Sequence, residues 1–406
     1  MLSLRLAWRN LWRNKRRTAI TLTALAVNTM VLITTYALID GDVENYLRYI
    51  TDLLNGEVQI HSPEYLEDHS LYKTIDNPDE IITMAKSKGI DASPRVYGYG
   101  LLATGNKSAG SLFQGIDPKL EKQAFTLHEH LQEGGEFISD VPDKGVVLGK
   151  KLAKTLNAEI GTEIIAVIQA ADGSLGTDIY KVTGILKSAG DKLDRSTAIF
   201  HIADFKELFV MGDQVHEVAL NSHRKVKVED IAGLLGNTID GLEVKTWKDL
   251  NPSMVEMLAM LDVSMGIFLS VFIIVAGLSV MNTMLMSTYD RIREFGILKA
   301  IGATPGLIVK DVLIEAMFLS LIATILGCIL GLLLSYYYSI YGIDMRGLQG
   351  DVTFAGIAFN PLWKAVIHPD SFVKPVITMW IISVLASVYP AVIAARLKPV
   401  DAIHHV

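Results

Sequence analysis

One uninterrupted apolar stretch limits this chain more than any other feature: no charged residue occurs between Val263 and Thr288. A helix that crosses the hydrocarbon core of a membrane needs about 20 mainly apolar residues. The composition agrees, with 50% hydrophobic residues, 20% charged residues and a mean hydropathy of +0.34. Such values indicate that the apolar residues are gathered in long runs. The sequence therefore predicts an integral membrane protein.

Three more stretches are long and apolar enough to span a membrane. They are Thr18–Ile39, Leu307–Tyr341 and Phe372–Ala395. The third span carries charged residues near its start, and Pro390 interrupts the fourth span near its end. We expect an α-helical membrane protein with four transmembrane helices and a large mixed α/β extracytoplasmic domain inserted between the first two. The expected segments are a cytoplasmic amphipathic helix at 1–17, spans at 18–40, 307–341 and 372–395, the extracytoplasmic domain at 41–255, a stalk with the second span at 256–289, a cytoplasmic helix at 290–306, an extracytoplasmic loop at 342–371 and a cytoplasmic tail at 396–406.

Basic residues in the flanks predict the orientation. Six precede the first span, with no acidic residue among residues 1–17: Arg5, Arg9, Arg13, Lys15, Arg16 and Arg17. Because cytoplasmic flanks carry an excess of lysine and arginine, the N-terminus is predicted to be cytoplasmic. Four spans return the C-terminus to the same side. The first span has basic flanks like a signal peptide, but it is too long and lacks a small-residue cleavage site, so we expect an uncleaved anchor.

The segment between the first two spans is long enough for a globular domain. Its pattern alternates between short β-branched runs and helical periodicity. The expected strands are Glu57–His61, Gly145–Leu148, Glu163–Ile168, Ile179–Leu186 and Ala198–Ile202. The expected helices are Pro78–Lys88, Lys150–Leu156, Ala203–Phe209 and Val228–Leu235. Residues Ala171–Ser174 are expected to form a hairpin tip.

The second span is expected to extend beyond the membrane. Asn251 suits a helix cap and Pro252 a first helical turn, and no helix breaker follows before Asp290. A continuous helix from Ser253 to Tyr289 would be ~55 Å long, against ~30 Å for a hydrocarbon core. Two interpretations stay open: a stiff stalk that carries a mechanical signal, or a simple anchor for the inserted domain.

Motifs of autonomous chemistry are missing from the sequence. No GxxxxGK[ST] phosphate loop and no GxSxG nucleophile elbow occur. The pairs His128/His130 and His404/His405 lack the spacing and the third ligand of a metal site, and Cys328 is the single cysteine. The net charge of −7 argues against nucleic-acid binding. We therefore expect no catalytic residue, no bound metal and no cofactor in this chain.

Polar and thioether side chains within the spans are candidates for a substrate cavity. Asn28 is expected either to hydrogen-bond a neighbouring helix or to face a substrate. Methionines crowd the second helix, where they suit either plain packing or an adaptable surface for acyl chains. The candidate cavity residues are Asn28, Met257, Leu261 and Met265.

Two amphipathic segments are expected on the cytoplasmic side. In the first, Leu4, Trp8, Leu11 and Trp12 share a helical face, which favours docking on the membrane surface. The second follows the second span and ends at Gly302, with Phe295, Leu298 and Ile301 on one face. Such a helix is typical of one that docks into a partner's groove, and a passive solvated loop is the alternative.

The residues of this second segment resemble a known family. RIREFGILKAIGAT at Arg291–Thr304 resembles the coupling helix of ABC transporter permeases of the MacB, FtsX and lipoprotein-releasing (Lol-type) superfamily, and YPAVIAARLKPVDAI at Tyr389–Ile403 resembles their C-terminal motif. In the insert, FQGIDP at Phe113–Pro118 and the stretches Gly145–Ile164 and Lys181–Phe209 resemble LolC/LolE-type permeases in particular. The resemblance implies the type VII ABC permease architecture.

The resemblance also implies partners and a cycle. A separate ABC ATPase would bind ATP, dimerise and push on the coupling segment. The residues implied in ATPase coupling are Arg291, Arg293, Glu294, Phe295, Gly296, Leu298, Lys299 and Gly302. A second permease subunit, identical or related, would complete the assembly in the cytoplasmic (inner) membrane of a bacterium, among membrane lipids.

Three activities are compatible with the resemblance. The leading one is release of lipoproteins, or another lipid-linked cargo, from the outer leaflet. The alternatives are efflux or lipid export of MacB type and regulation of a cell-wall hydrolase of FtsX type. The segment 342–371 is longer than the loop expected of such permeases; an ordered cap or a membrane-dipping piece is expected there, and it indicates a divergent branch.

Overall fold

The computed structural model describes residues 9, 11–187, 190–236, 239, 241–344, 353–354, 357–358 and 362–396. The chain forms two compact units. The helical unit comprises residues 1–44, 258–348 and 361–406, and the α/β unit comprises residues 45–257 and 349–360.

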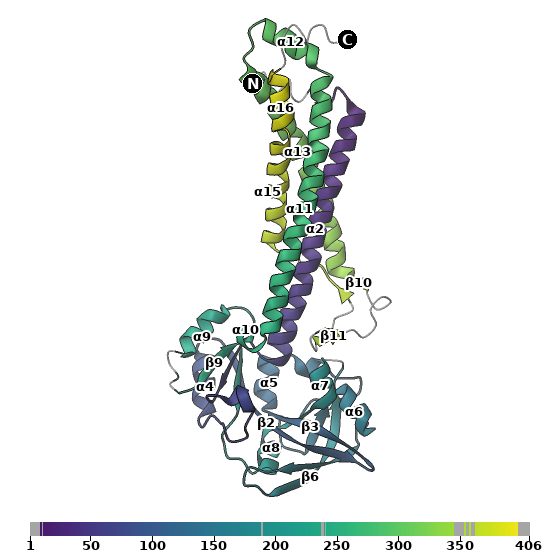
Figure 1. Cartoon of the computed structure of the whole chain (residues 1–406). Coiled ribbons are helices and arrows are strands. Elements are labelled where there is room, and N and C mark those ends of the chain that lie inside the picture. Colours follow the sequence, from purple (N-terminus) through teal and green to yellow (C-terminus); the bar gives the residue numbers. More distant parts are fainter. Residues whose placement is uncertain are drawn as a thin grey trace. The chain divides into compact units, whose positions relative to one another are not determined.

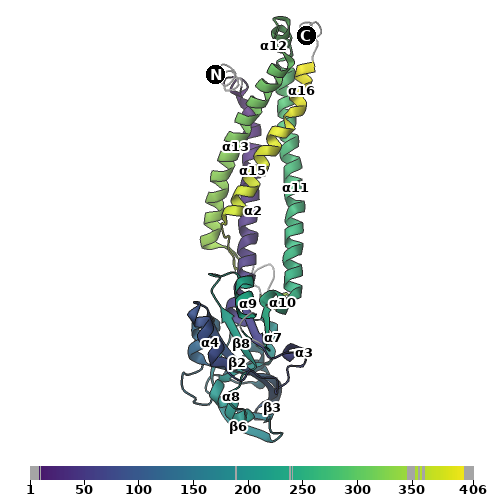
Figure 2. The same cartoon turned by 90° about the vertical axis from the view of Figure 1, so that its left-hand side faces the viewer.

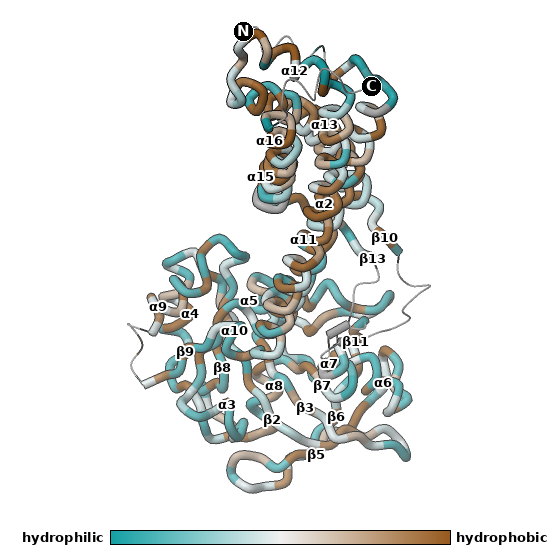
Figure 3. The backbone as a smooth tube through the Cα atoms, turned by 45° about the horizontal axis from the view of Figure 1, so that its top comes forward, coloured by the Kyte–Doolittle hydropathy of each residue, from teal (hydrophilic) through white to brown (hydrophobic). Residues whose placement is uncertain are grey.

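Long helices make up the helical unit (Figures 1 and 2). Its described helices are α2 (Lys15–Arg48), α11 (Pro252–Tyr289), α12 (Ile292–Ala300), α13 (Pro305–Tyr341), α15 (Pro369–Ala386) and α16 (Val388–Arg396). Four stretches of helix are long and apolar enough to cross a membrane: Thr18–Leu54, Pro252–Tyr289, Pro305–Tyr341 and Phe372–Arg396. The four predicted apolar helices, each long enough to span a membrane, and the continuous helix through the second one are therefore confirmed. Hydropathy colouring shows the long apolar runs along these helices, whereas it alternates in the α/β unit (Figure 3).

Two helix ends differ from the sequence prediction. Helix α2 continues past residue 40 to Arg48 and is followed by a π-helical turn, η1 (Tyr49–Leu54). The acidic residues Asp40 and Asp42 end the apolar run, but they do not end the helix. The fourth span breaks at Ser387, before the predicted interruption at Pro390. A proline ring clashes with the carbonyl four residues earlier, here that of Ala386, so the break precedes the proline.

Helix α2 lies against both α11 and α13. Thr21 and Thr283 join their hydroxyls at 2.7 Å, and Asn28 donates to the carbonyl of Phe272 at 3.1 Å. Gly327 of α13 lets that helix approach α2 closely, because a Cβ there would lie 2.6 Å from Cβ of Thr29. Small residues are the usual means of close approach between membrane helices.

Replacing Gly327 by leucine should therefore force α2 and α13 apart. We expect a loss of about 1–3 kcal/mol in the free energy of unfolding, the usual cost of overpacking. The measurement is the thermal unfolding midpoint of the full chain in detergent. Gly266→Leu in α11 is the matched control, because a Cβ at Gly266 meets no atom within 4 Å. Equal midpoints for the two variants would contradict this packing.

The α/β unit is built around a mixed sheet. Its strands are β1 (Val58–His61), β2 (Asp91–Thr104), β3 (Lys107–Ile116), β4 (Gly145–Leu148), β5 (Glu163–Gln169), β6 (Leu175–Ile185), β7 (Thr197–His201), β8 (Glu217–Asn221) and β9 (Glu243–Thr246). Its helices are α3 (Tyr65–Asp68), α4 (Pro78–Ser87), α5 (Pro118–Ala124), η2 (Leu127–Glu129), α6 (Lys150–Leu156), α7 (Asp191–Ser196), α8 (Ile202–Phe209), α9 (Val228–Gly236) and α10 (Trp247–Leu250). The predicted α/β domain, its five strands, its four helices and the hairpin tip are confirmed, with shifts at some ends.

The nine strands follow the order β3-β7-β4-β6-β5-β2-β8-β1-β9. Strand β2 also pairs with β3, so the six strands from β3 to β2 close on themselves. The remaining strands, β8, β1 and β9, extend from the other half of β2. Phe113, Phe200 and Phe209 pack face to face or edge to face in the apolar core. The segment after α2 leads into β1, and the segment after β9 leads into α11, so both connections are made next to the β1–β9 pair.

The predicted cap between the last two spans is described only in part. Strand β10 (Ile343–Asp344) pairs with β13 (Leu362–Trp363), and β11 (Thr353–Phe354) pairs with β12 (Ile357–Ala358). Val366 donates its N–H to the carbonyl of Ala37 in α2 at 2.8 Å. Gly41 lets residues 364–366 approach α2 closely, because a Cβ at Gly41 would overlap the carbonyl of Lys364. Residues 364–366 thus lie against α2, and several other residues of the predicted cap lie outside the described ranges.

Candidate functional site

The predicted coupling segment forms helix α12 between α11 and α13. Arg291 occupies the N-cap position without a side-chain capping hydrogen bond, and Gly302 follows the helix end with a φ of +101°, a conformation that favours glycine. Thr304 and Pro305 then start α13. The predicted short helix ended by Gly302 is confirmed.

The inner face of α12 is fixed within the chain. Phe295 is 1% exposed and packs with Ile308 and Val312 of α13 and with alanines of α16. Gly296 is also buried, and Leu298 is partly buried against the same cluster. These residues hold the helix in place from inside.

The outer face of α12 differs from the predicted docking face. Ile301 is 77% exposed, but Phe295 faces inward, so the expectation that both share one partner-facing side is wrong. Ile297, which the sequence analysis did not select, is 49% exposed. Arg293 and Glu294 are exposed too. We call Arg293, Glu294, Ile297 and Ile301 the coupling surface; its contact with an ATPase remains a prediction.

A charge network lies next to this surface. The guanidinium of Arg291 binds Glu315 of α13 at 2.8 Å and Glu294 at 3.0 Å, and it stacks on the ring of Phe295. Glu294 also accepts from Arg13, which precedes α2, at 2.5 Å. Partial burial alone would raise the pKa of Glu294, but the hydrogen bonds from Arg291 and Arg13 hold it below its usual value. The network ties α12 to α13 and to the start of α2.

The cations of the coupling segment have different surroundings. Lys299 donates to the carbonyl of Ala395 at 2.5 Å, near the end of α16. Arg293 makes no ion pair with any residue that the structure describes. Arg291 is held by its two carboxylates. Arg293 is therefore the arginine of this segment that is best placed to meet an external carboxylate.

The candidate cavity residues are not brought together by the structure. Asn28 bridges α2 and α11 through the Phe272 carbonyl, which is the first of its two expected roles. Met265 is buried, and Leu261 is partly exposed on the same helix. Met257 lies on the stretch of α11 that belongs to the α/β unit. Their role in substrate binding remains a prediction.

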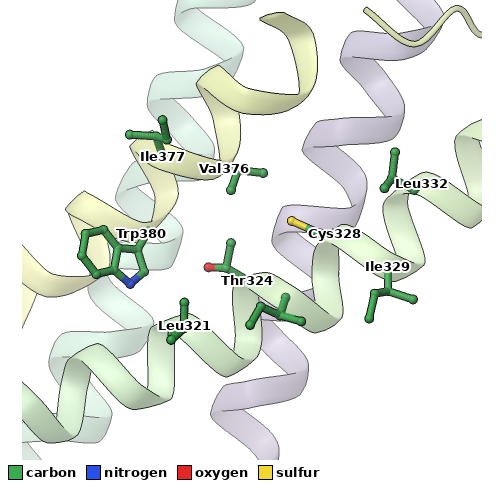
Figure 4. Close-up of a pocket in the computed structure, with 9 residues that line it drawn as sticks. Leu321, Thr324, Cys328, Ile329, Leu332, Val376, Ile377 and Trp380 are labelled. Atoms are coloured by element: carbon green, nitrogen blue, oxygen red, sulfur yellow. The ribbon is translucent and has the colours of Figure 1, made fainter. Parts of the chain in front are cut away.

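An apolar pocket lies instead between α13 and α15 (Figure 4). Its volume is about 330 Å³, and its walls carry no charged side chain. Trp380 of α15 and Thr324 of α13 lie on facing sides, with Cys328 and aliphatic side chains around them. The lining suits hydrocarbon. This pocket could not be predicted from the sequence, because its residues form the ordinary apolar pattern of a span.

Of the predicted amphipathic segment at 1–17, the structure describes residue 9 and residues 11–17. Leu4 and Trp8 lie outside the described residues. Leu11 is buried in an apolar cluster with side chains of α2, α11, α13 and α15, and Trp12 is 41% exposed. In the described part of the chain, no cluster of three or more His, Cys, Asp or Glu side chains could hold a metal ion.

A second charge cluster lies in the α/β unit. Arg95 of β2 is 1% exposed and binds Glu121 of α5 at 2.7 Å and Glu217 of β8 at 3.2 Å. Glu217 also accepts from Tyr97 and lies 3.3 Å from the Nε2 of His61. Burial alone would raise the pKa of Glu217, but His61 and Arg95 outweigh it, so the pKa lies below its usual value.

Acid should destabilise this unit through the neighbouring His216. Its Nδ1 accepts the N–H of Tyr97 at 2.9 Å, so the ring must be neutral, and burial lowers its pKa. A depressed histidine pKa contributes stability above the unfolded value of about 6.5 that is lost as the pH falls below it. Glu217 adds a further loss below about pH 4.5.

The measurement is the thermal midpoint of the full chain in detergent between pH 7.5 and pH 5. We expect the midpoint to fall with acid in the wild type and to fall less in His216→Gln. His128→Gln, at a histidine whose side chain is 30% exposed, is the control and should follow the wild type. A wild-type midpoint that is constant over this range would contradict the assignment.

Comparison with known proteins adds the family. A family model described as "MacB-like periplasmic core domain" matches residues 18–237, and one described as "FtsX-like permease C-terminal" matches residues 266–399. The chain is 24% identical over 398 residues to the lipoprotein-releasing system transmembrane protein LolC of Xylella fastidiosa, covering 94% of this chain and 92% of that protein.

Two other relatives show how the family varies. The chain is 26% identical to the uncharacterised ABC transporter permease YknZ of Bacillus subtilis, over 60% of this chain and 54% of that protein. It is 30% identical over 160 residues to the macrolide export ATP-binding/permease protein MacB of Burkholderia thailandensis, which is 39% of this chain and 21% of that protein. With one family model matching more than half of its length and a second matching its last three spans, this chain belongs to the ABC transporter permeases that join a MacB-like periplasmic core domain to an FtsX-like permease C-terminal region.

Proposed function

We propose that this chain is a non-catalytic permease subunit that uses ATP hydrolysed by a separate ATPase to release lipoproteins from the outer leaflet of a bacterial inner membrane. In this proposal both termini are cytoplasmic, the α/β unit is extracytoplasmic, and a second permease subunit completes the assembly. The observation that carries the proposal is the similarity to LolC, which extends over nearly the full length of both proteins. It thus includes the spans, the coupling segment and the α/β unit.

The residues of the chain support a permease role, with ATP bound and hydrolysed by a partner. The sequence has no phosphate loop, which supports nucleotide binding by a partner. The coupling surface offers two exposed isoleucines beside Arg293 and Glu294, and an amphipathic helix with apolar anchors and charges suits docking into a groove. The buried face of α12 would pass the partner's displacement to α13 and α16 through Phe295.

A second candidate function is MacB-type efflux or lipid export. It is favoured by the match of the MacB-like core model to residues 18–237 and by the 30% identity to a macrolide exporter over 160 residues. The two functions differ in their partners, because efflux across an envelope requires an adaptor rather than an acylated cargo.

The test is a pull-down of the detergent-solubilised chain from its native membrane, with mass spectrometry of the bound proteins. We expect an ABC ATPase, a permease subunit and acylated lipoproteins. An adaptor without lipoproteins would support efflux instead, and a cell-wall hydrolase without lipoproteins would support transduction of FtsX type. Absence of any ATPase would overturn the proposed function.

A further inference from the structure

Four consecutive residues, Asn221–Arg224, hold the segment in which the first membrane helix ends. We call them the socket. They begin at the last residue of β8 and lie against η1, the π-helical turn that continues α2, and against Glu57, which precedes β1. Single π-helical turns are uncommon and occur frequently at functional sites.

The socket grips η1 through a buried amide. Asn221 is fully buried, and its Nδ2 group shares its two hydrogens among the carbonyl of Ala124 at 3.0 Å, the carboxylate of Asp52 at 3.2 Å and the carbonyl of Thr51 at 3.3 Å. The guanidinium of Arg224 binds the same carboxylate at 3.1 Å. On the other side, Thr126 donates its N–H to the carbonyl of Asp52 at 2.8 Å. Backbone and side chain of Asp52 are thus both held.

The socket grips Glu57 with backbone amides. The carboxylate of Glu57 is fully buried and accepts the N–H and hydroxyl of Ser222 at 2.8 and 2.6 Å and the N–H of Arg224 at 2.6 Å. His223 and Arg224 have φ values of +54° and +61°. This strained left-handed backbone is the kind that aims N–H groups at an anion.

Glu57 also meets the chain on its way to the second membrane helix. Its carbonyl accepts the N–H of Trp247 at 3.0 Å, and β1 pairs with β9 just before that residue. Helix α11 begins five residues later, at Pro252. The segment that follows α2 and the segment that precedes α11 are therefore hydrogen-bonded to each other at Glu57, and the socket holds the side chain of this residue.

We propose that the socket is the joint that passes displacement of α2 into the sheet of the α/β unit, with Asn221 and Arg224 as its positioning residues. The inference rests on the proposed function and adds to it the place where force enters the α/β unit. A chain of charged and buried hydrogen bonds to one short segment transmits displacement, because packed and bonded contacts are stiff whereas solvated loops yield.

The test uses the full complex of this chain with its ATPase in proteoliposomes that contain an acylated lipoprotein. Arg224→Glu places a second carboxylate beside Asp52, and Arg224→Lys keeps a cation there. Arg195→Glu, at an exposed ion pair of the same unit, is the matched control. The readouts are ATP hydrolysed, lipoprotein released and amide hydrogen exchange of residues 49–57.

We expect Arg224→Glu to lower the lipoprotein released per ATP by about fivefold or more, at the lower end of ordinary coupling free energies, while ATP hydrolysis continues. Exchange at residues 49–57 should rise in this variant alone. Arg224→Lys and the control should keep the wild-type ratio. Loss of release in proportion to lost folded protein, or an unchanged ratio in Arg224→Glu, would overturn the inference. If the wild type releases nothing with ATP, the proposed function itself fails, and exchange at residues 49–57 still shows whether the socket holds this segment.

Discussion

Replacing Arg95 by alanine is expected to lower the free energy of unfolding of the α/β unit by about 3–5 kcal/mol, the usual result of removing one partner from a buried ion pair. The guanidinium binds both carboxylate oxygens of Glu121, one of Glu217 and the carbonyl of Leu54. It also stacks on the ring of Phe125, 4.2 Å from its centroid. Without it, two buried carboxylates lose their counter-charge.

Two variants separate charge from volume. Arg95→Met fills most of the space and should still lose most of the stability, because the carboxylates stay unpaired. Adding Glu121→Gln to Arg95→Met should recover part of the loss, since one buried charge is removed. Chemical unfolding of the full chain in detergent measures all three.

The control is Lys122→Ala. Lys122 follows Glu121 in α5 and pairs with Asp140 at 3.0 Å, but both of these side chains are solvent-exposed. Exposed pairs contribute about 0–1 kcal/mol, so this variant should stay close to the wild type. Similar losses in Arg95→Ala and Lys122→Ala would refute the role of the buried cluster.

The second large effect is expected at the coupling surface. Ile301→Asp replaces the most exposed apolar side chain of the segment by a carboxylate. We expect the affinity for the ATPase to fall by about 30-fold or more, as it does when a central interface residue is changed. Ile297→Asp should act in the same direction. Titration of the labelled ATPase against the reconstituted permease measures the affinity.

Leu175→Asp provides the matched control, because Leu175 is equally exposed but lies in the α/β unit. Arg293→Glu tests the charge contribution separately and should weaken binding most at low salt. Glu294 is less suited to this purpose because its carboxylate already binds Arg13 and Arg291, so its replacement also breaks contacts within the chain. Unchanged affinity in both isoleucine variants would place the ATPase elsewhere.

The sequence was most informative where local patterns decide the structure. Helix α11 begins within one residue of the prediction and ends at it, because a long run without charges or breakers suffices to define it. Strand β4 and helix α6 have the predicted bounds, set by turn residues and periodicity. Such elements depend little on distant contacts.

Tertiary contacts decided what the sequence did not predict. Strand β2 contains Pro94, Gly98 and Gly100, which argue against a strand, yet it pairs along both edges. Gly98 is needed because a Cβ there would overlap the ring of Phe209. Arg95 finds Glu217 only through the pairing of β2 with β8, and no local pattern shows such a partner.

The coupling segment shows the same limit. Periodicity placed Phe295, Leu298 and Ile301 together, but Ile301 is the C-cap residue, where helical geometry ends. Docking of α12 against α13 and α16 then selected Phe295 for the inside. The helix could be predicted from the sequence, and the choice of its outward face could not.

ATP-dependent release of a lipoprotein from proteoliposomes tests the central claim most directly. The purified chain, with the ATPase and any permease subunit that accompany it, is reconstituted with a radiolabelled acylated lipoprotein, and release to a soluble acceptor is measured with ATP or a non-hydrolysable analogue. We predict release with ATP only, and its loss in Ile301→Asp but not in Leu175→Asp. ATP hydrolysis without release in the wild type, or equal release with the analogue, would contradict the account.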